Sequence, residues 1–123
     1  MTRHANGDAL MISLTLPLPP SVNRHPRQHY LPKAVKDFRC AVAAIVASEG
    51  VKPIIGRMDV TVRVSGHSAR PFDLDNRIKP LFDALQLAGC FPNDNAIDRF
   101  EVLRDPPIKG GACKVLILAR TGT

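Results

Sequence analysis

Apolar and polar residues alternate in two stretches of the chain, which is the period of a β-strand with one buried face. Between residues 57 and 64 every even position is apolar and every odd position is polar. Residues 10–16 alternate in the same way until prolines at positions 17, 19 and 20 end the pattern. We therefore predict half-buried strands over 57–64 and 10–16.

Two other stretches repeat apolar residues every three or four positions, the spacing of an amphipathic helix. The first covers 33–49 and ends at Gly50; its apolar face is Val35, Phe38, Val42, Ile45 and Val46. The second runs from position 76 to a stop at Gly89; its apolar face is Ile78, Leu81, Phe82 and Leu85. Both are predicted to be helices that pack against the strands.

Two further strands are predicted near the C-terminus, at about 97–104 and at 113–118. The second is almost wholly apolar, which predicts burial on both faces. Residues 105–111 are rich in proline and glycine and predict a hairpin-like connection. The order β-α-β-α-β-β indicates an α/β fold, with α+β as the alternative, in which helices cover a mixed four-stranded sheet. We expect one domain over 10–119, after a loose leader over 1–9.

The net charge of the chain indicates the class of its binding partner. The chain has 123 residues, enough for one domain, and its 17 Lys and Arg against 11 Asp and Glu give a net charge of +6. Such a balance favours a nucleic-acid partner, and the alternative is a soluble basic protein with no such partner. No apolar run approaches the ~20 residues that span a bilayer, so we expect no membrane.

The three cysteines indicate a cytoplasmic protein. Cys40, Cys90 and Cys113 are odd in number and form no Cys-x-x-Cys pair. We expect reduced thiols that serve as small core residues.

A long basic segment over 17–32 is the first candidate for binding. Arg24 and Arg27 are suited to phosphate, and Tyr30 could stack on a base. His25 and His29 are metal-ligand candidates, disfavoured because no cysteine or carboxylate lies nearby. A plain surface connection is the alternative for the whole segment.

The stretch 72–89 carries the candidate chemistry. Asp73 and Asp75 are two apart, and Lys79 follows Asp75 by one helical turn. Asp75 alone could be a helix N-cap. Two close carboxylates repel unless a cation lies between them, so a divalent metal site is the competing interpretation. An ion pair with Asp75 or Asp83 is the simplest role for Lys79.

Asp94 is the third acid that we add to this cluster. The intervening helix carries the chain ~20 Å away, and residues 88–94 can span at most ~20 Å. Asp94 therefore reaches Asp73 and Asp75 by running straight back, or it joins the cluster of a second subunit. Three carboxylates around Mg²⁺ could activate a water and neutralise phosphate charge, with Lys79 at the rim.

Several motifs together resemble the RusA family of Holliday junction resolvases. They are Leu16-Pro17-Leu18-Pro19-Pro20-Ser21-Val22-Asn23-Arg24, Asp73-Leu74-Asp75-Asn76 with Lys79, Asp83-Ala84-Leu85, Asn93-Asp94 and Lys109-Gly110-Gly111. The resemblance runs from about residue 12 to 118. The combination is specific, although no single motif is.

The resemblance implies a Mg²⁺-dependent endonuclease, with Mn²⁺ as a substitute, that acts as a homodimer in DNA recombination and repair. It would place symmetric nicks in a four-way DNA junction. By the resemblance, Asp73, Asp75 and Asp94 match the family's essential acids, and Lys79 matches its catalytic lysine. The residues assigned to DNA contact are Asn23, Arg24, Arg27, Arg70, Asn76, Arg77 and Lys109. One departure is that Arg70 alone remains of the arginines that can precede the first acid.

Three rival functions stay open from the sequence. They are a DNA-binding module without catalysis, a metal-dependent phosphohydrolase for small substrates, and a structural protein that binds no metal. Cleavage of a junction in Mg²⁺ would exclude the first and the third.

Overall fold

The predicted order of elements is confirmed. The computed structural model describes residues 10–21 and 32–120. Its elements are β1 (Met11–Leu16), α1 (Lys33–Ser48), β2 (Met58–Ser65), α2 (Asp75–Leu87), the 3₁₀ turn η1 (Asp94–Ala96), β3 (Ile97–Asp105) and β4 (Ala112–Ala119). The leader predicted over 1–9 lies outside the described residues, as do most of the basic segment and its candidates Asn23, Arg24 and Arg27.

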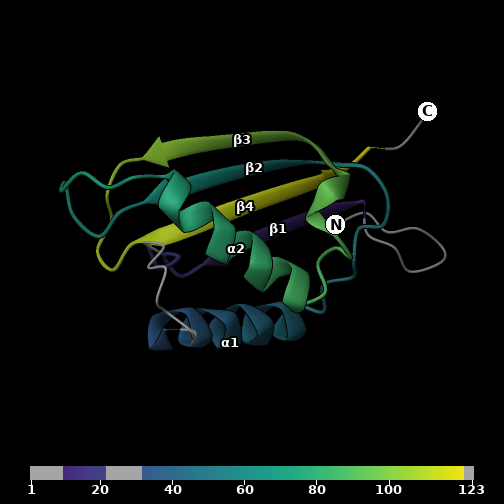
Figure 1. Ribbon diagram of the computed structural model, residues 1–123, viewed down its shortest axis with the longest axis horizontal. Helices are drawn as coiled ribbons and strands as arrows, with labels where there is room; N and C mark the ends of the chain where they lie inside the picture. Colours follow the sequence, from purple (N-terminus) through teal and green to yellow (C-terminus); the bar gives the residue numbers. More distant parts are fainter. Residues whose placement is uncertain (1–9, 22–31, 121–123) are drawn as a thin grey trace.

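The four strands form one mixed sheet in the order β1-β4-β2-β3 (Figure 1). β2 and β3 are parallel neighbours, because the chain returns through α2 between them. β4 pairs antiparallel with both β1 and β2. The expected hairpin between the last two strands is wrong: β2 lies between β3 and β4, so residues 106–111 cross over one strand at the end of the sheet.

The core lies between one face of this sheet and the two helices. The even positions of β2 are at most 1% exposed, as their alternation predicts. Both helices supply a buried stripe: Val35, Phe38, Val42 and Val46 from α1, and Leu81, Ala84 and Leu85 from α2.

The outer face of the sheet is uncovered, which corrects the prediction for the last strand. On β4, Cys113, Val115 and Ile117 are buried, but Lys114 is exposed and Leu118 is 42% exposed. The strand is central in the sheet, yet helices cover it on one side only. The apolar run of 113–118 therefore reflects the central position of β4 in the sheet, and it does not reflect burial on both faces.

Glycine ends α2 as expected. Gly89 has a φ of 90°, a conformation that glycine adopts without steric cost. This turn lets the amide of Cys90 donate to the carbonyl of Leu85 at 3.0 Å. Cys90 then accepts a bond from the amide of Ile54, 2.9 Å away, so the chain leaves α2 toward the start of β2.

The three thiols are free, and two of them are core residues as predicted. Cys90 and Cys113 are buried, whereas Cys40 is exposed on α1, so the expectation that it is a core residue is wrong. Burial raises the pKa of Cys90 to about 11 and that of Cys113 to about 12. Within 10–21 and 32–120, no helix is long and apolar enough to cross a membrane.

We expect iodoacetamide to modify Cys40 first and to spare Cys90 and Cys113 in the folded protein at pH 8. The thiolate is the reactive form, and the raised pKa values keep both buried groups protonated at that pH. Mass spectrometry of the intact protein should show one rapid addition, and three after denaturation in urea. Equal rates at all three sites would contradict the buried positions.

Candidate active site at one end of the sheet

Four chain segments meet at one end of the sheet. The ladder pairs Ser65 at the end of β2 with Asp105 at the end of β3 and with Ala112 at the start of β4. The last residue of β1, Leu16, pairs with Cys113 beside them. The proline-rich segment, the loop before α2 and the glycine pair at 110–111 therefore all begin or end here.

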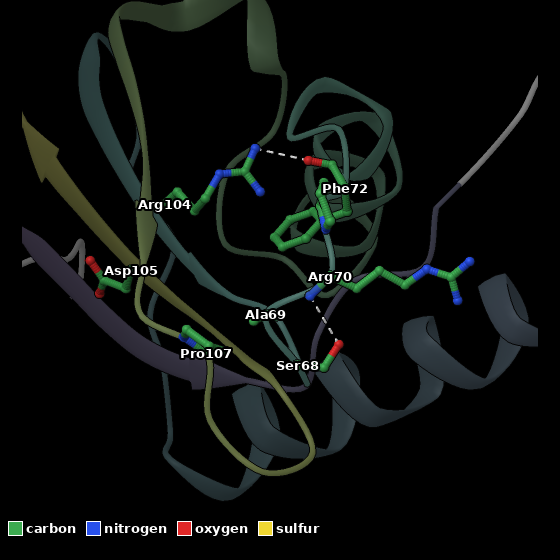
Figure 2. Close-up of a pocket in the computed structure, with 9 residues that line it drawn as sticks. Ser68, Ala69, Arg70, Phe72, Arg104, Asp105 and Pro107 are labelled. Carbon is green, nitrogen blue, oxygen red and sulfur yellow. Dashed lines mark hydrogen bonds between the residues drawn. The ribbon is translucent and has the colours of Figure 1, made fainter.

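The ring of Phe72 is the contact that joins these segments. It lies so close to Gly66 that a Cβ at that position would be 2.7 Å from the ring. The guanidinium carbon of Arg104 lies 4.4 Å from the ring centroid and that of Arg77 lies 4.8 Å from it. Arg104 also donates to the Phe72 carbonyl at 2.8 Å, as Figure 2 shows. Phe72, the residue directly before Asp73, is thus held through both its ring and its backbone carbonyl.

Arg77 connects this contact to the proline-rich segment. Its Nη1 donates to the carbonyl of Pro19 at 2.5 Å, and its Nε is buried without a hydrogen-bond partner. Burial lowers the pKa of the Arg77 guanidinium. On the other side of the same segment, Leu18 lies so close to Gly111 that a Cβ there would meet it at 2.9 Å. Arg77 therefore has a structural role, and its assignment to DNA contact stays a prediction.

Asp73 and Asp75 are both exposed at the entry to α2. The amide of Asn76 lies 3.4 Å from Oδ2 of Asp73, a long hydrogen bond that orients the carboxylate. Asp75 is the first residue of the helix, and the N-cap is Leu74 with no side-chain bond to the backbone. The capping interpretation of Asp75 is therefore wrong. Its charge instead lies at the positive end of the helix dipole, which favours a carboxylate there.

Lys79 makes the simplest contact expected of it. Its Nζ lies 2.8 Å from Oδ1 of Asp83, one turn further along α2, and Arg39 of α1 lies 3.9 Å from the same carboxyl group. Lys79 remains largely exposed beside the two acids. Its catalytic role stays a prediction.

Asp94 lies far from the other two acids in the same chain. It begins η1, which leads into β3 where Ile97 pairs with Met58, whereas Arg104 at the other end of β3 holds Phe72. The seven residue steps between Ile97 and Arg104 correspond to ~23 Å of strand. After α2 the chain does not run straight back. Accordingly, the described residues contain no group of three acids, histidines or cysteines arranged to hold a metal.

Asp73, Asp75 and Asp94 differ from the other aspartates that the structure describes in their ion pairing. Each of the others is bound to a lysine or arginine: Asp37, Asp59, Asp83, Asp98 and Asp105. None of the ion pairs formed within 10–21 and 32–120 involves Asp73, Asp75 or Asp94. In a chain with an excess of cations, the aspartates left without a counter-charge are thus the three expected to hold a metal.

A family model described as Endodeoxyribonuclease RusA matches residues 17–117, which include this whole site. The chain belongs to the RusA family. It is 34% identical over 111 residues to the crossover junction endodeoxyribonuclease RusA of Escherichia coli K12, covering 85% of this chain and 92% of that protein. Its identity to the enzyme of the same name from Enterobacteria phage 82 is 35%, with 85% and 91% covered, and to that from Shigella sonnei 33%, with 85% and 92% covered.

The remaining predicted contacts of this RusA-family chain surround the same end of the sheet. Arg70 and Lys109 are exposed, in the loop before Asp73 and in the connection between β3 and β4. Arg70 lines a cavity of about 270 Å³ together with Phe72, Arg104 and Pro107, and its side chain extends away from the Phe72 ring (Figure 2). Cationic side chains therefore remain accessible at this end of the sheet.

Phe72 and Arg104 were missed as site residues by the sequence analysis. They are 32 positions apart, and no local pattern relates them. One signal was present: Arg104 shares a strand face with Phe100 and Val102, so an arginine stands where the period of β3 calls for an apolar residue.

We expect Arg104→Ala to lower the free energy of unfolding by ~1–2 kcal/mol. The change removes a hydrogen bond worth ~1 kcal/mol and a cation–π contact worth ~0.5–1 kcal/mol. Urea unfolding followed by circular dichroism measures the difference. The control is Arg70→Ala, whose exposed side chain extends away from the Phe72 ring (Figure 2), and it should stay within ~0.5 kcal/mol of wild type. Equal effects of the two changes would contradict the role of Arg104.

Proposed function

We propose that this RusA-family chain is a magnesium-dependent endonuclease that resolves four-way DNA junctions by paired, symmetric nicks during recombination and repair. The observation that carries the proposal is the set of three aspartates that form no ion pair within 10–21 and 32–120, two of which lie exposed at the α2 entry. The names of the relatives supply the substrate class. The free thiols and the DNA substrate support a cytoplasmic location.

The donor set suits magnesium. Asp73 and Asp75 offer hard carboxylate oxygens that are open to solvent, and Mg²⁺ binds through one or two carboxylates while it keeps several waters. Mn²⁺ accepts the same ligands and is the expected substitute. When bound, the metal would lower the pKa of a water and neutralise charge on the scissile phosphate. Asp94 would complete the set.

The cationic residues of the chain would bind and orient the DNA. Arg70, in the loop before Asp73, and Lys109, in the connection between β3 and β4, are exposed and would contact phosphates of the strands. Lys79 lies one turn into α2, where its ammonium could approach the phosphate that Asp75 faces. Asp83 limits the positions that this ammonium can take, because it holds the Nζ atom at 2.8 Å. Lys79 would stabilise negative charge as the phosphodiester bond breaks.

The site would be shared between two chains of a homodimer. Asp94 lies about one strand length from Asp73 in a single chain, so a partner offers the third carboxylate more readily than the same chain does. A two-fold dimer also presents two equivalent sites to the two equivalent strands of a junction.

We expect Asp73→Asn, Asp75→Asn and Asp94→Asn each to lower the rate of junction cleavage by about 100-fold or more, since each change removes a metal ligand. Junction affinity in a gel shift should be retained. Cleavage is measured on a labelled four-way junction and a matched linear duplex, in Mg²⁺ and in EDTA. The control is Asp37→Asn on α1, where the aspartate is paired with Lys33.

Three outcomes would each refute part of this function. Cleavage in EDTA would refute the requirement for a metal, and equal cutting of linear duplex would refute the selectivity for junctions. Binding without cleavage by the wild type would favour a DNA-binding module.

We expect nicking activity to return when Asp75→Asn and Asp94→Asn chains are refolded together. If Asp94 acts in the partner's site, each mixed dimer contains one site with all its acids and one site without two of them. Single-strand nicks should then appear, although each variant alone is inactive. Inactive mixtures that contain mixed dimers, verified by two different affinity tags, would place Asp94 in its own chain's site.

A further inference from the structure

β3 begins with a bulge, directly after the turn η1. Met58 of β2 pairs with Ile97 of β3. The next residue of β2, Asp59, pairs with Arg99, so Asp98 is an extra residue in β3. A bulge changes the direction of a strand, and bulges are frequent next to active sites, where they aim a side chain. The residue that this bulge could aim lies in η1.

The extra residue anchors the start of β3 on both faces of the sheet. Ile97 lies opposite the buried Met58 and packs against the core. Asp98 is exposed on the other face, where Nε of Arg57 donates to its Oδ1 at 2.7 Å and Nη2 of Arg57 donates to the same oxygen. Nη1 of Arg120 lies 3.5 Å from Oδ2 of Asp98. The hydrogen bond from Arg57 lowers the pKa of Asp98, so this carboxylate stays ionised to a lower pH.

Arg57 also extends from this ion pair to η1. Its Nη1 donates a long hydrogen bond of 3.5 Å to the carbonyl of Asn95. Within the turn, the side chain of Asn93 accepts a hydrogen bond from the Asn95 amide at 2.9 Å. Asn95 is therefore held through both its amide and its carbonyl. It directly follows Asp94, whose carboxylate forms none of the ion pairs found within 10–21 and 32–120.

We propose that Arg57 and Asp98 are positioning residues for Asp94. One guanidinium binds both the bulge carboxylate and the turn, so it fixes the direction of η1 relative to the sheet and thereby the place of the Asp94 carboxylate. Exposed ion pairs contribute little to folding stability, so we expect the effect of this one to be local. The inference rests on the proposed function, because it takes Asp94 as a metal ligand.

Metal affinity without DNA tests the positioning role. Arg57→Gln should raise the dissociation constant for Mn²⁺ about tenfold, since groups that orient a metal ligand change affinity by about 10–100-fold. Electron paramagnetic resonance of the free ion measures it. The matched control is Arg63→Gln, because Arg63 pairs with another aspartate of β3, Asp105, at 3.0 Å and the two pairs are similarly exposed. The control should change the constant less than about twofold.

A double variant separates positioning from a general loss of structure. In an Asp94→Asn background, Arg57→Gln should change the Mn²⁺ dissociation constant by less than about twofold, because the carboxylate that Arg57 positions is already absent. Equal effects of Arg57→Gln with and without the Asp94 carboxylate would overturn the proposal. Equal effects of Arg57→Gln and Arg63→Gln would also overturn it.

Hydrogen exchange of the metal-free protein reports on the turn itself. The amides of Asn95 and Ala96 should exchange about tenfold faster in Arg57→Gln and in Asp98→Asn, while the central strands β2 and β4 keep their protection. Unchanged exchange at both amides would contradict the contact between Arg57 and η1. Faster exchange throughout β2 and β4 would assign Arg57 a role in folding and overturn the positioning role.

These measurements use no DNA, so they are separate from the nuclease activity. Junction cleavage by the wild type, together with an unchanged Mn²⁺ affinity in Arg57→Gln, would refute the positioning role and leave the proposed function standing. An effect of Arg57→Gln that requires the Asp94 carboxylate, in a protein whose wild type never cuts a junction, would support the positioning role and refute the proposed function.

Discussion

The packing of two arginines on Phe72 is the interaction on which the rest of the site depends. Phe72 lies on Gly66 beyond β2, under Arg104 from β3 and Arg77 from α2, and Arg77 in turn holds the proline-rich segment. No hydrogen bond from the sheet reaches Asp73 or Asp75 themselves among the described residues. The two acids are placed instead by the backbone beside them, which leaves their carboxylates open to a ligand.

This arrangement separates rigidity from reactivity. Arg77 and Arg104 are charged residues that hold the fold together from different depths: Arg104 is exposed, whereas Arg77 is half-buried and burial lowers its pKa. An arginine keeps its proton under such conditions because its pKa starts so high, whereas a lysine would lose its proton more readily. The cations that fix the loop, Arg77 and Arg104, and the exposed cations outside this contact, such as Arg70 and Lys109, therefore have different roles at the same end of the sheet.

The elements were predictable because each has a strong local period. Alternation in β2 predicted its buried residues, the apolar stripes of α1 and α2 predicted which face of each helix packs on the sheet, and Gly89 predicted a helix end. Within the predicted stripes, Ile45, Ile78 and Phe82 are only partly buried. The order of strands was not predictable in this way. A hairpin between the last two strands was the simplest interpretation of residues 105–111. In the structure β3 pairs with β2 instead, because the α2 crossover makes these two strands parallel neighbours. Burial of β4 on one face only, and exposure of Cys40, likewise depend on where the helices lie.

For the site, the three candidate acids were selected from spacing and motif, but their separation could not be predicted. Chain length left Asp94 two routes, straight back to Asp73 and Asp75 or into the cluster of a second subunit, and in the structure the chain does not run back. The contact between Arg104 and Phe72 could not be predicted, because contacts between residues 32 positions apart depend on the register between strands. The capping role of Asp75 depended on the exact start of the helix. The helix starts at Asp75 rather than after it, so the side chain of Asp75 does not cap the helix.

The uncovered face of the sheet has a consequence for how a polyanion approaches. Its arginines are matched by acids: Arg57 with Asp98, Arg63 with Asp105, Arg99 with Glu101, and Arg120 with Asp59 and Asp98. Charges neutralised at short range contribute little to the field a few Debye lengths away. The net charge of +6 must then be carried mainly by the rest of the surface. The uncovered face is therefore a weak attractor for an incoming DNA strand, whereas Arg70 and Lys109, at the end of the sheet where the acids lie, are exposed and keep their charge available to it.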